Sequence, residues 1–473
     1  MVSSAAGESP GPQRLSGSLL VVVASIIAAF GGLLFGYDTG VVAAALPFIK
    51  DAFALDDTMK QVVTASLLAG AVVGVVVGGS LSDRFGRRTT LLGVTVLYAV
   101  ATAGSAIAPT AELLILARFF LGVAIGISSL VVPTYIAEMA PPKNRGTLVS
   151  LHQFMVTVGI LIAYLVGYGL AGEASGWRWM IGVAIAPAVL MFIGVLILPE
   201  SPRWLLSRGD RQRARGVLAR TRPAEVVDSE LTEIEQMVRE EGRVSYRELL
   251  GPRFRRWISV GVVVAGASQV VGVNAIIYYV PTILEDIGGY GKSAAIGVSV
   301  AVGIVNVLFT IPALIWIDRM GRRKWILGGT GVLIVALAAL GVVFLFPLQN
   351  PVVFAAMLIV LMVYESAFAC SLGIAIWLVN SEIFPNNVRG KAASFGIVTH
   401  WGMNLVVSLT VLTLINAIGA PGVFWLYGVL GVLCLIYLYR WLPETKNRSL
   451  EEIEADLTEK PLSGRGAADG HSG

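Results

Sequence analysis

Two residues of opposite charge stand inside otherwise apolar stretches, where together they could bind and release a proton. Asp38 follows GGLLFGY at 31–37, and Arg118 stands within LLILARFFLG at 113–122. A charge in such surroundings costs several kcal/mol unless a counter-ion or a proton offsets it. If a proton on Asp38 frees Arg118, the pair is a switch that couples protonation to conformation. The alternative is a permanent structural ion pair.

A second group of side chains offers uncharged hydrogen bonds beside flat aromatic faces. A carboxamide supplies both a donor and an acceptor, and an indole supplies a flat surface and one N–H. This combination suits an uncharged ligand with many hydroxyls and an apolar face. The alternative is that each lone amide joins two helices. The group, all in apolar surroundings, consists of Gln153, Gln269, Asn274, Asn306, Asn404, Trp377 and Trp401.

Composition excludes several classes of protein. The 473 residues are 56% hydrophobic and only 14% charged, which is far from the balance of a soluble domain. Two cysteines and three histidines cannot build a disulfide framework, a zinc site or a haem site. No nucleophile elbow or phosphate-binding loop occurs. We therefore expect no enzyme, no metal, no cofactor and no nucleic-acid partner, but a protein whose partner is the lipid bilayer.

Apolar runs long enough to cross a membrane recur along the whole chain. Their number is even, so both termini are predicted to lie on one side. The first run is too long for the apolar part of a signal peptide, so we expect it to be retained. The predicted spans are 19–46, 61–82, 89–108, 112–136, 148–171, 177–198, 257–284, 294–317, 325–346, 352–380, 391–416 and 421–442.

The basic residues predict which side holds the termini. Of the 35 Lys and Arg residues, only Lys50, Lys60, Arg178 and Lys292 fall in loops on the side away from the termini. Cytoplasmic loops carry the excess of Lys and Arg in membrane proteins. We therefore predict a multi-pass protein of the cell membrane, with both termini in the cytoplasm.

The spans divide the chain into two groups of six with a polar insertion between them. Within the insertion, ELTEIEQMVREE at 230–241 has apolar residues at helical spacing, so we expect short amphipathic helices rather than a solvated linker. The predicted organisation is a disordered tail, a six-helix half, a cytoplasmic helical linker, a second six-helix half and a cytoplasmic tail. Their ranges are 1–18, 19–198, 199–256, 257–442 and 443–473.

The two halves carry the same marks in the same order, which indicates an internal duplication. DRFGRR at 83–88 recurs as DRMGRR at 318–323, and PES at 199–201 recurs as PET at 443–445. A glutamate followed by Arg-Gly recurs as well, at Glu138 and at Glu382. A repeat of six helices keeps its membrane orientation, so the halves are related by an axis along the membrane normal. Transporters with this architecture bind their ligand between the halves, near the midplane.

The repeated charged motifs predict a latch at the cytoplasmic ends of the helices. Paired Asp and Glu at matching positions are not explained by anchoring through Arg alone, which is the alternative. Asp and Glu can pair with Arg there or cap a neighbouring helix. The predicted gate consists of Asp83, Arg84, Arg88, Glu138, Arg145, Glu200, Asp318, Arg319, Arg323, Glu382, Arg389 and Glu444.

Three of these motifs carry a family resemblance. GSLSDRFGRR at 79–88 resembles the inter-helix loop motif of the major facilitator superfamily. PESPRWL at 199–205 and PETKNRSLEEI at 443–453 resemble the motifs that follow helices six and twelve of its sugar porters. The likeness extends from about residue 20 to 458. It implies an all-α membrane protein with twelve helices in two pseudo-symmetric halves.

The resemblance also implies roles for single residues. SQVVGVNAIIYY at 268–279 is similar to the helix-seven sugar motif, which makes Gln269 and Asn274 expected sugar ligands and Tyr278 and Tyr279 an expected outer lid. The remaining expected sugar ligands are Gln153, Asn306, Trp377, Trp401 and Asn404. Proton symporters of this family carry the aspartate found here at position 38, whereas many facilitative members have an uncharged residue.

The chain departs from the family pattern at several positions. Ser268 stands where relatives often have a glutamine, and His400 stands where they often have an amide or another polar residue. SLGIAIW at 371–377 lacks the usual prolines, so bending there is expected to rely on Gly373. Glu365 is embedded in the tenth predicted span, and two interpretations stay open for it: a second titrating group, or a protonated carboxyl bonded to a neighbour.

These observations predict a monomeric secondary transporter that imports a monosaccharide with a proton by alternating access. A hexose such as glucose or galactose is expected first, and a pentose or a polyol is the alternative. A facilitative uniporter of the same fold is the main competing function. A sugar sensor would be expected to carry a larger cytoplasmic extension than residues 443–473.

Overall fold

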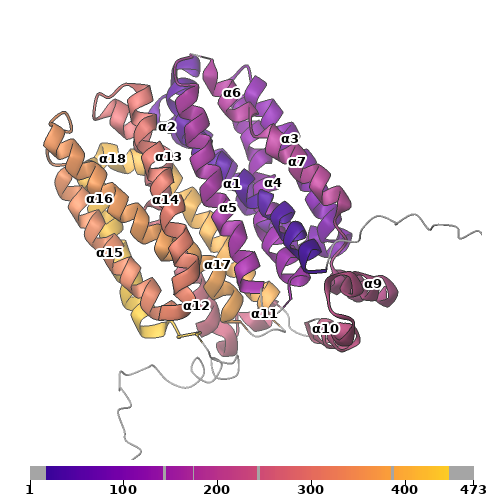
Figure 1. Cartoon of the computed structure of the whole chain (residues 1–473). Coiled ribbons are helices and arrows are strands. Elements are labelled where there is room, and N and C mark those ends of the chain that lie inside the picture. Colours follow the sequence, from indigo (N-terminus) through magenta and orange to yellow (C-terminus); the bar gives the residue numbers. More distant parts are fainter. Residues whose placement is uncertain (1–16, 142–144, 174, 242–245, 385–387, 447–473) are drawn as a thin grey trace, which may run out of the picture.

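The computed structural model describes residues 17–141, 145–173, 175–241, 246–384 and 388–446, and its regular elements are helices (Figure 1). The first group packs together in the indigo-to-magenta part of Figure 1. It consists of α1 (Gly17–Phe53), α2 (Asp57–Phe85), α3 (Arg87–Ile107), α4 (Ala111–Met139), α5 (Arg145–Gly169), α6 (Gly176–Gly182) and α7 (Ile185–Ile197).

The second group occupies the orange-to-yellow part of Figure 1. It consists of α12 (Pro252–Val270), α13 (Val273–Asp286), α14 (Lys292–Met320), α15 (Arg322–Val343), α16 (Pro351–Cys370), α17 (Leu372–Glu382) and α18 (Arg389–Trp441). Between the groups come α8 (Pro202–Ser207), α9 (Arg211–Thr221), η2 (Ala224–Val226), α10 (Val227–Glu241) and α11 (Tyr246–Leu249).

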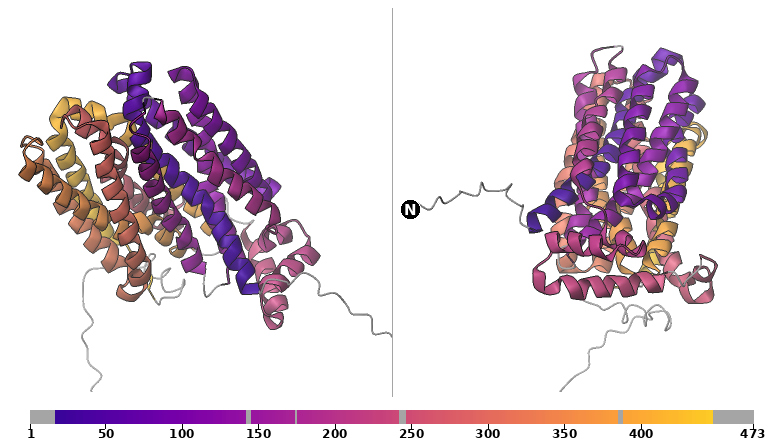
Figure 2. Two further views of the ribbon diagram at one scale, coloured as in Figure 1. Left: turned by 45° about the horizontal axis from the view of Figure 1, so that its top comes forward. Right: turned by 90° about the vertical axis from the view of Figure 1, so that its right-hand side faces the viewer.

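Helices α9 to α11 lie at one end of the bundle, which we call the linker end; the opposite end is the far end (Figure 1). Figure 2 shows them running across the ends of the long helices. On α10 the apolar residue Leu231 is buried, as its helical spacing predicts. Arg222 pairs with Glu230 at 2.8 Å and donates to the carbonyl oxygen of Met139, the last residue of α4, at 3.0 Å. The linker is thus attached to the first group of helices.

Eleven helices of the described chain are long and apolar enough to cross a membrane, whereas the sequence predicts twelve spans. The difference lies in α18, which contains both 391–416 and 421–442. At 1.5 Å per residue its 53 residues would extend about 80 Å, more than twice the hydrocarbon core of a bilayer. The backbone is non-helical at Gly419, where φ is 73° and ψ is 161°. Two helices therefore meet there, as the gap between the two predicted spans requires.

Three predicted spans are interrupted inside the bundle; the span 177–198 has a short turn at 183–184, between α6 and α7. The span 257–284 breaks at Gly272, whose left-handed φ of 83° separates α12 from α13. A Cβ at this position would lie 2.3 Å from the Tyr427 ring, so both the conformation and the space require glycine. The span 352–380 breaks at Ser371, where φ is −119° and ψ is −89°. The expectation that Gly373 provides this bend is wrong, because Gly373 lies within α17.

Small residues bring the helices of the first group very close. A Cβ on Gly36 of α1 would stand 1.9 Å from the carbonyl oxygen of Val156 on α5. A Cβ on Gly122 of α4 would meet the carbonyl oxygen of Leu67 on α2 at the same distance. Close backbone approach through glycine is typical of helix packing in membranes. The crossings of α1 with α5 and of α2 with α4 are therefore tightly specified.

Helices from the two groups also pack on one another. α14 lies against α5, and α18 lies against α2. α13 contacts α1, and α17 contacts α5. Most of the polar residues singled out from the sequence lie on these facing helices, so the site can be built between the two groups.

Candidate functional site

Asp38 is enclosed between α1 and α3. It is 1% exposed and accepts a hydrogen bond from the Tyr98 hydroxyl of α3, which also lies 3.3 Å from the carbonyl oxygen of Leu34. One neutral donor does not offset the cost of burying a full negative charge. Asp38 therefore needs either a proton or the approach of a cation.

Arg118 of α4 is the cation that the sequence pairs with Asp38, and it is 1% exposed. Its Nε donates to the carbonyl oxygen of Val63 on α2 at 2.9 Å. Arg118 interacts electrostatically with Asp38, but these two described side chains form no ion pair in this conformation. The two charged side chains are thus buried in the same group of helices without being joined. Either charge can gain from a rearrangement that joins them.

The broken helix α12–α13 carries a chain of polar side chains. Asn274 donates to Gln269 Oε1 at 2.5 Å, across the break at Gly272. Gln269 Nε2 lies 3.0 Å from His400 Nδ1 on α18 and 3.1 Å from the hydroxyl oxygen of Ser268. Ser268 and His400 are two of the departures from the family pattern, and they contact each other at 3.3 Å. The two substitutions therefore share one location in the site.

Two tryptophans of the second group bond to residues of the first. Trp377 of α17 donates its indole N–H to Gln153 Oε1 of α5 at 2.8 Å. Trp401 of α18 donates to the Ser129 hydroxyl of α4 at 3.2 Å. The sequence singles out both indoles and Gln153. It did not identify Ser129, because one hydroxyl in an apolar run has many structural uses.

An aromatic cluster links these groups. His400 stands between Trp377 and Trp401, with ring centroids 6.1 and 5.7 Å away. His152 of α5 meets Trp377 edge to face at 5.6 Å. His152 is 1% exposed, and neither of its ring nitrogens has a hydrogen-bond partner in the described structure. Unmet buried donors and acceptors of this kind favour a polar ligand or ordered water.

The expected lid tyrosines are buried. Asn404 donates to the Tyr278 hydroxyl at 3.3 Å, and its own Oδ1 has no partner in the described structure. The Tyr279 hydroxyl donates to the carbonyl oxygen of Ser408 at 3.1 Å. Both rings are less than 3% exposed. They cover the polar chain from the side of the far end, since α13 runs from the break toward that end.

Asn306 has different surroundings from the other expected sugar ligands. Its Nδ2 donates to Glu365 Oε1 of α16, and the Thr310 hydroxyl lies 3.5 Å from its Oδ1. Both Asn306 and Glu365 are buried. The sequence predicts Asn306 as a sugar ligand. In the structure, the neighbour that the Glu365 carboxyl contacts is this same Asn306.

At the linker end of the first group, Arg87 is the centre of a charged cluster. It pairs with Glu138 at 3.0 Å and with Asp83 at 3.0 Å. Glu200 accepts hydrogen bonds from the backbone N–H groups of Arg87 and Arg88 at the start of α3. A carboxylate at a helix N-terminus satisfies free N–H groups and the helix dipole.

The second group repeats this arrangement. Arg322 pairs with Glu382 at 2.9 Å. Glu444 accepts from the backbone N–H groups of Arg322 and Arg323 at the start of α15, at 2.9 and 3.2 Å. Gly86 and Gly321 precede these helices with φ of 94° and 92°. The duplication read from the sequence therefore recurs as one geometry.

The remaining predicted gate residues have other surroundings. Arg88 and Arg323 donate to the carbonyl oxygens of Leu196 and Tyr439 near helix ends. Asp83 and Arg84 are exposed. The side chains of Arg145, Asp318, Arg319 and Arg389 lie outside the described part of the chain. Sequence reasoning omitted Arg87 and Arg322 from the gate, although their motif contains them, because spacing does not tell which arginine of the pair points at the glutamate.

The far end carries charged contacts that the sequence did not predict. Asp286, the last residue of α13, pairs with Lys50 of α1 at 2.7 Å and with Lys60 of α2 at 3.1 Å. Lys60 also pairs with Asp57 at 2.7 Å. Lys292 of α14 pairs with Asp51 of α1. The pairs made by Asp286 and by Lys292 join the first group of helices to the second.

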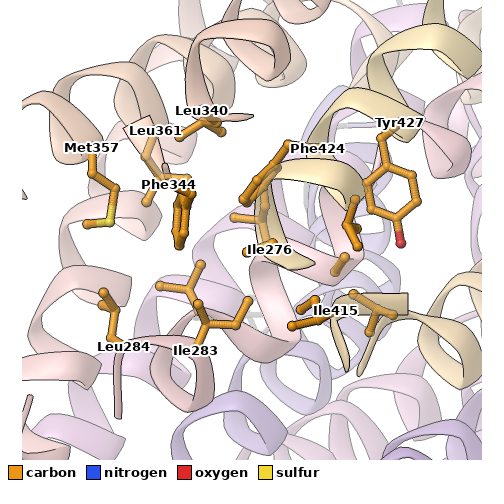
Figure 3. A pocket seen from close by; sticks show the side chains of 15 residues that line it. Ile276, Ile283, Leu284, Leu340, Phe344, Met357, Leu361, Ile415, Phe424 and Tyr427 are labelled. Carbon is orange, nitrogen blue, oxygen red and sulfur yellow. The ribbon is translucent and has the colours of Figure 1, made fainter. Parts of the chain in front are cut away.

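An apolar cavity of about 30 Å³ lies within the second group, between α13, α15, α16 and α18 (Figure 3). Figure 3 shows Phe344, Phe424, Met357 and Leu361 around it. It is too small for a sugar ring, and its lining offers almost no hydrogen bonds. The polar groups described above, rather than this cavity, have the chemistry to bind a polyhydroxylated ligand.

Comparisons with known proteins agree with this picture. A family model described as "Sugar (and other) transporter" matches residues 24–457. The chain is 37% identical to the "Arabinose-proton symporter" of Bacillus subtilis (strain 168), with 92% of this chain and 94% of the relative covered. It is also 37% identical to the "Galactose-proton symporter" of Escherichia coli (strain K12), with 94% and 96% covered.

A solved structure supports the same grouping. The proton:xylose symporter XylE, bound to 6-bromo-6-deoxy-D-glucose, superposes with a TM-score of 0.81 at 31% identity. The match covers 93% of this chain and 99% of that chain.

Proposed function

Because the chain belongs to the sugar porter family of the major facilitator superfamily, and is a transporter rather than an enzyme, we propose that it imports a monosaccharide together with a proton. The observation that supports proton coupling is the buried Asp38, which accepts a hydrogen bond from Tyr98 and forms no ion pair with Arg118. A uniporter has no need for a buried carboxylate at this cost. The names of the two relatives and of XylE support the same coupling.

We propose that the linker end faces the cytoplasm. Of the Lys and Arg residues in the predicted loops, all but Lys50, Lys60, Arg178 and Lys292 fall on the side of this end. With that orientation, the far end is the outside. The contacts of Asp286 with Lys50 and Lys60 then hold the outer side closed in this conformation.

The proton acts on the helices through charge. A neutral Asp38 is satisfied by the Tyr98 hydroxyl alone. When the proton leaves, the buried carboxylate gains most from Arg118, whose described side-chain bond is a single one to a carbonyl on α2. Joining them requires α1 and α4 to shift, so proton release favours one conformation over the other.

The sugar acts on the interface between the halves. Gln153 and Trp377 face each other across it and are 2.8 Å apart. A sugar bound there replaces this bond with hydroxyl contacts to Gln153, Gln269 and Asn274, while its apolar face lies on an indole. Its hydroxyls also satisfy the unpartnered Oδ1 of Asn404. Binding therefore changes which contacts hold the halves together, as alternating access requires.

The test is uptake by purified protein in liposomes, across a panel of labelled hexoses, pentoses and polyols. An inward proton gradient is expected to drive accumulation of at least one monosaccharide. Asp38→Asn is expected to abolish accumulation and to leave exchange of sugar across the membrane, since the amide cannot carry the proton. Asp228→Asn, an exposed aspartate of the linker, is the matched control.

Two outcomes would contradict the proposal. If the gradient has no effect on wild-type accumulation, the protein is a uniporter. If Asp38→Asn still accumulates sugar, the proton is carried elsewhere. The panel decides between a hexose and a pentose, which differ by one hydroxymethyl substituent and which the named relatives do not resolve.

A further inference from the structure

Glu365 is a buried carboxyl that the coupling through Asp38 does not use. It is 0% exposed on α16, and its only described bond is the one it accepts from Asn306 Nδ2. Its second oxygen, Oε2, has no partner in the described structure. No cation lies within ion-pair distance among the described residues. A charged carboxylate in this position would be uncompensated, so its neutral form is the one that the surroundings tolerate.

The position of Glu365 is close to the level of the coupling pair. Glu365 is 14 residues from Pro351 at the far end of α16, and Asn306 is 14 residues from Lys292 at the far end of α14, which places both about 21 Å along their helices. Asp38 is 15 residues from Phe53 at the far end of α1, a similar depth. Glu365 thus lies in the second half at the level where Asp38 lies in the first.

The neighbours of Glu365 leave it as the group most able to change charge. Its titratable neighbours are two tyrosines, Tyr164 of α5 and Tyr364 of its own helix. Tyr278 of α13 in turn lies near Tyr164, and Tyr427 of α18 lies near Tyr364. The charged residues of α14, α15 and α17 stand near the ends of those helices. Cys370 of α16 donates to the carbonyl oxygen of Phe309.

We propose that Glu365 is a positioning residue for sugar binding, which orients Asn306 and holds it more firmly when it loses its proton. This rests on the proposed role of Asn306 as a sugar ligand. Glu365 Oε1 accepts the Asn306 N–H, which leaves the Asn306 Oδ1 to accept from a sugar hydroxyl. Ionised Glu365 accepts the same N–H in a charge-assisted bond, which is stronger, so the orientation of the amide is fixed more firmly. The protein then has two protonation sites, one for coupling and one for sugar affinity.

The experiment measures sugar exchange in Asp38→Asn liposomes, because exchange there does not require Asp38 to titrate. In this background the KM of exchange is expected to fall as pH rises, with little change in maximal rate. Adding Glu365→Gln keeps a neutral acceptor for Asn306 without a titrating proton, so the KM is expected to stay flat with pH, near the value that the Asp38→Asn protein shows at low pH. Adding Glu365→Ala is expected to raise the KM about tenfold at every pH, the effect of one lost hydrogen bond and a freed amide.

Glu112→Gln, an exposed glutamate in the first turn of α4, is the matched control and is expected to leave the pH profile unchanged. The proposal is overturned if the Asp38→Asn protein shows a flat KM, or if adding Glu365→Gln leaves the pH dependence as it was. A fall in maximal rate with KM unchanged for Glu365→Ala would also overturn it. The role of Asp38 is judged separately, from accumulation, so one claim can fail without the other.

Discussion

The two ends of the bundle use charge in different ways. At the far end, the ion pairs of Asp286 with Lys50 and Lys60 join the first half to the second. At the linker end, the described pairs of Arg87 with Glu138 and of Arg322 with Glu382 each lie within one half. Pairs within a half can persist when the halves rock, whereas pairs between halves must break. The far end therefore holds the conformational contacts, and the linker end holds the structural ones.

This difference changes the meaning of the predicted latch. The repeated motifs build a fixed corner in each half, where a glutamate caps the helix that follows the glycine turn. In this conformation the corners are separate, and a latch between the halves would need contacts beyond those described. The predictions below test the distinction, beginning with the largest expected effect.

Glu200→Gln is expected to lower the stability of the protein by about 2 kcal/mol, because one acceptor serves the backbone N–H groups of Arg87, Arg88 and Ser201. Glu444→Gln, its repeat counterpart, is expected to do nearly the same. Thermal unfolding in detergent measures both. Glu112→Gln, at an exposed position, is the control. The proposed structural role of the linker-end glutamates would be contradicted if either variant unfolded at the same temperature as this control.

Asp286→Asn is expected to raise the population open at the far end about tenfold, or ~1.4 kcal/mol, with little effect on thermal stability. The reason is that Lys60, whose side chain is 3% exposed, loses its partner across the halves. The measurement is the distance between spin labels at Glu112→Cys on α4 and Val352→Cys on α16, with Cys370 and Cys434 replaced by alanine. An unchanged distance distribution would show that the pair does not hold the far end.

Lys292→Ala is expected to have the smallest effect, less than about threefold on the same population. The side chains of Lys292 and Asp51 are 23% and 61% exposed, and exposed pairs contribute at most about 1 kcal/mol. The effect is expected to vanish at high salt. A shift as large as that of Asp286→Asn would contradict the ranking by burial.

Much of the fold could be predicted from the sequence because its signals are local. Apolar length indicates the spans, and the repeated motifs indicate two halves. The turn at Gly419 also follows from the gap between two runs. The break at Ser371 could not be predicted, since the residue types there do not show which backbone torsions depart from a helix.

The sequence singles out the members of the candidate site more readily than their contacts. Asp38, Gln153 and Trp377 stand out as polar groups in apolar runs, and Tyr98 and Ser129 do not, since their hydroxyls occur in many helices. The far-end pairs were missed because Lys50 and Asp286 are 236 residues apart in the chain. Nothing in their neighbourhoods indicates that the fold brings them together.

The central claim is that one buried proton site couples sugar import to the proton gradient. The most direct test is to add sugar outside liposomes that hold the protein and a pH-sensitive dye, with no gradient imposed. Wild-type protein is expected to acidify the interior as sugar enters, and Asp38→Asn, in liposomes preloaded with the same sugar, is expected to exchange it without acidification. Sugar entering wild-type liposomes with no change in internal pH would contradict the claim.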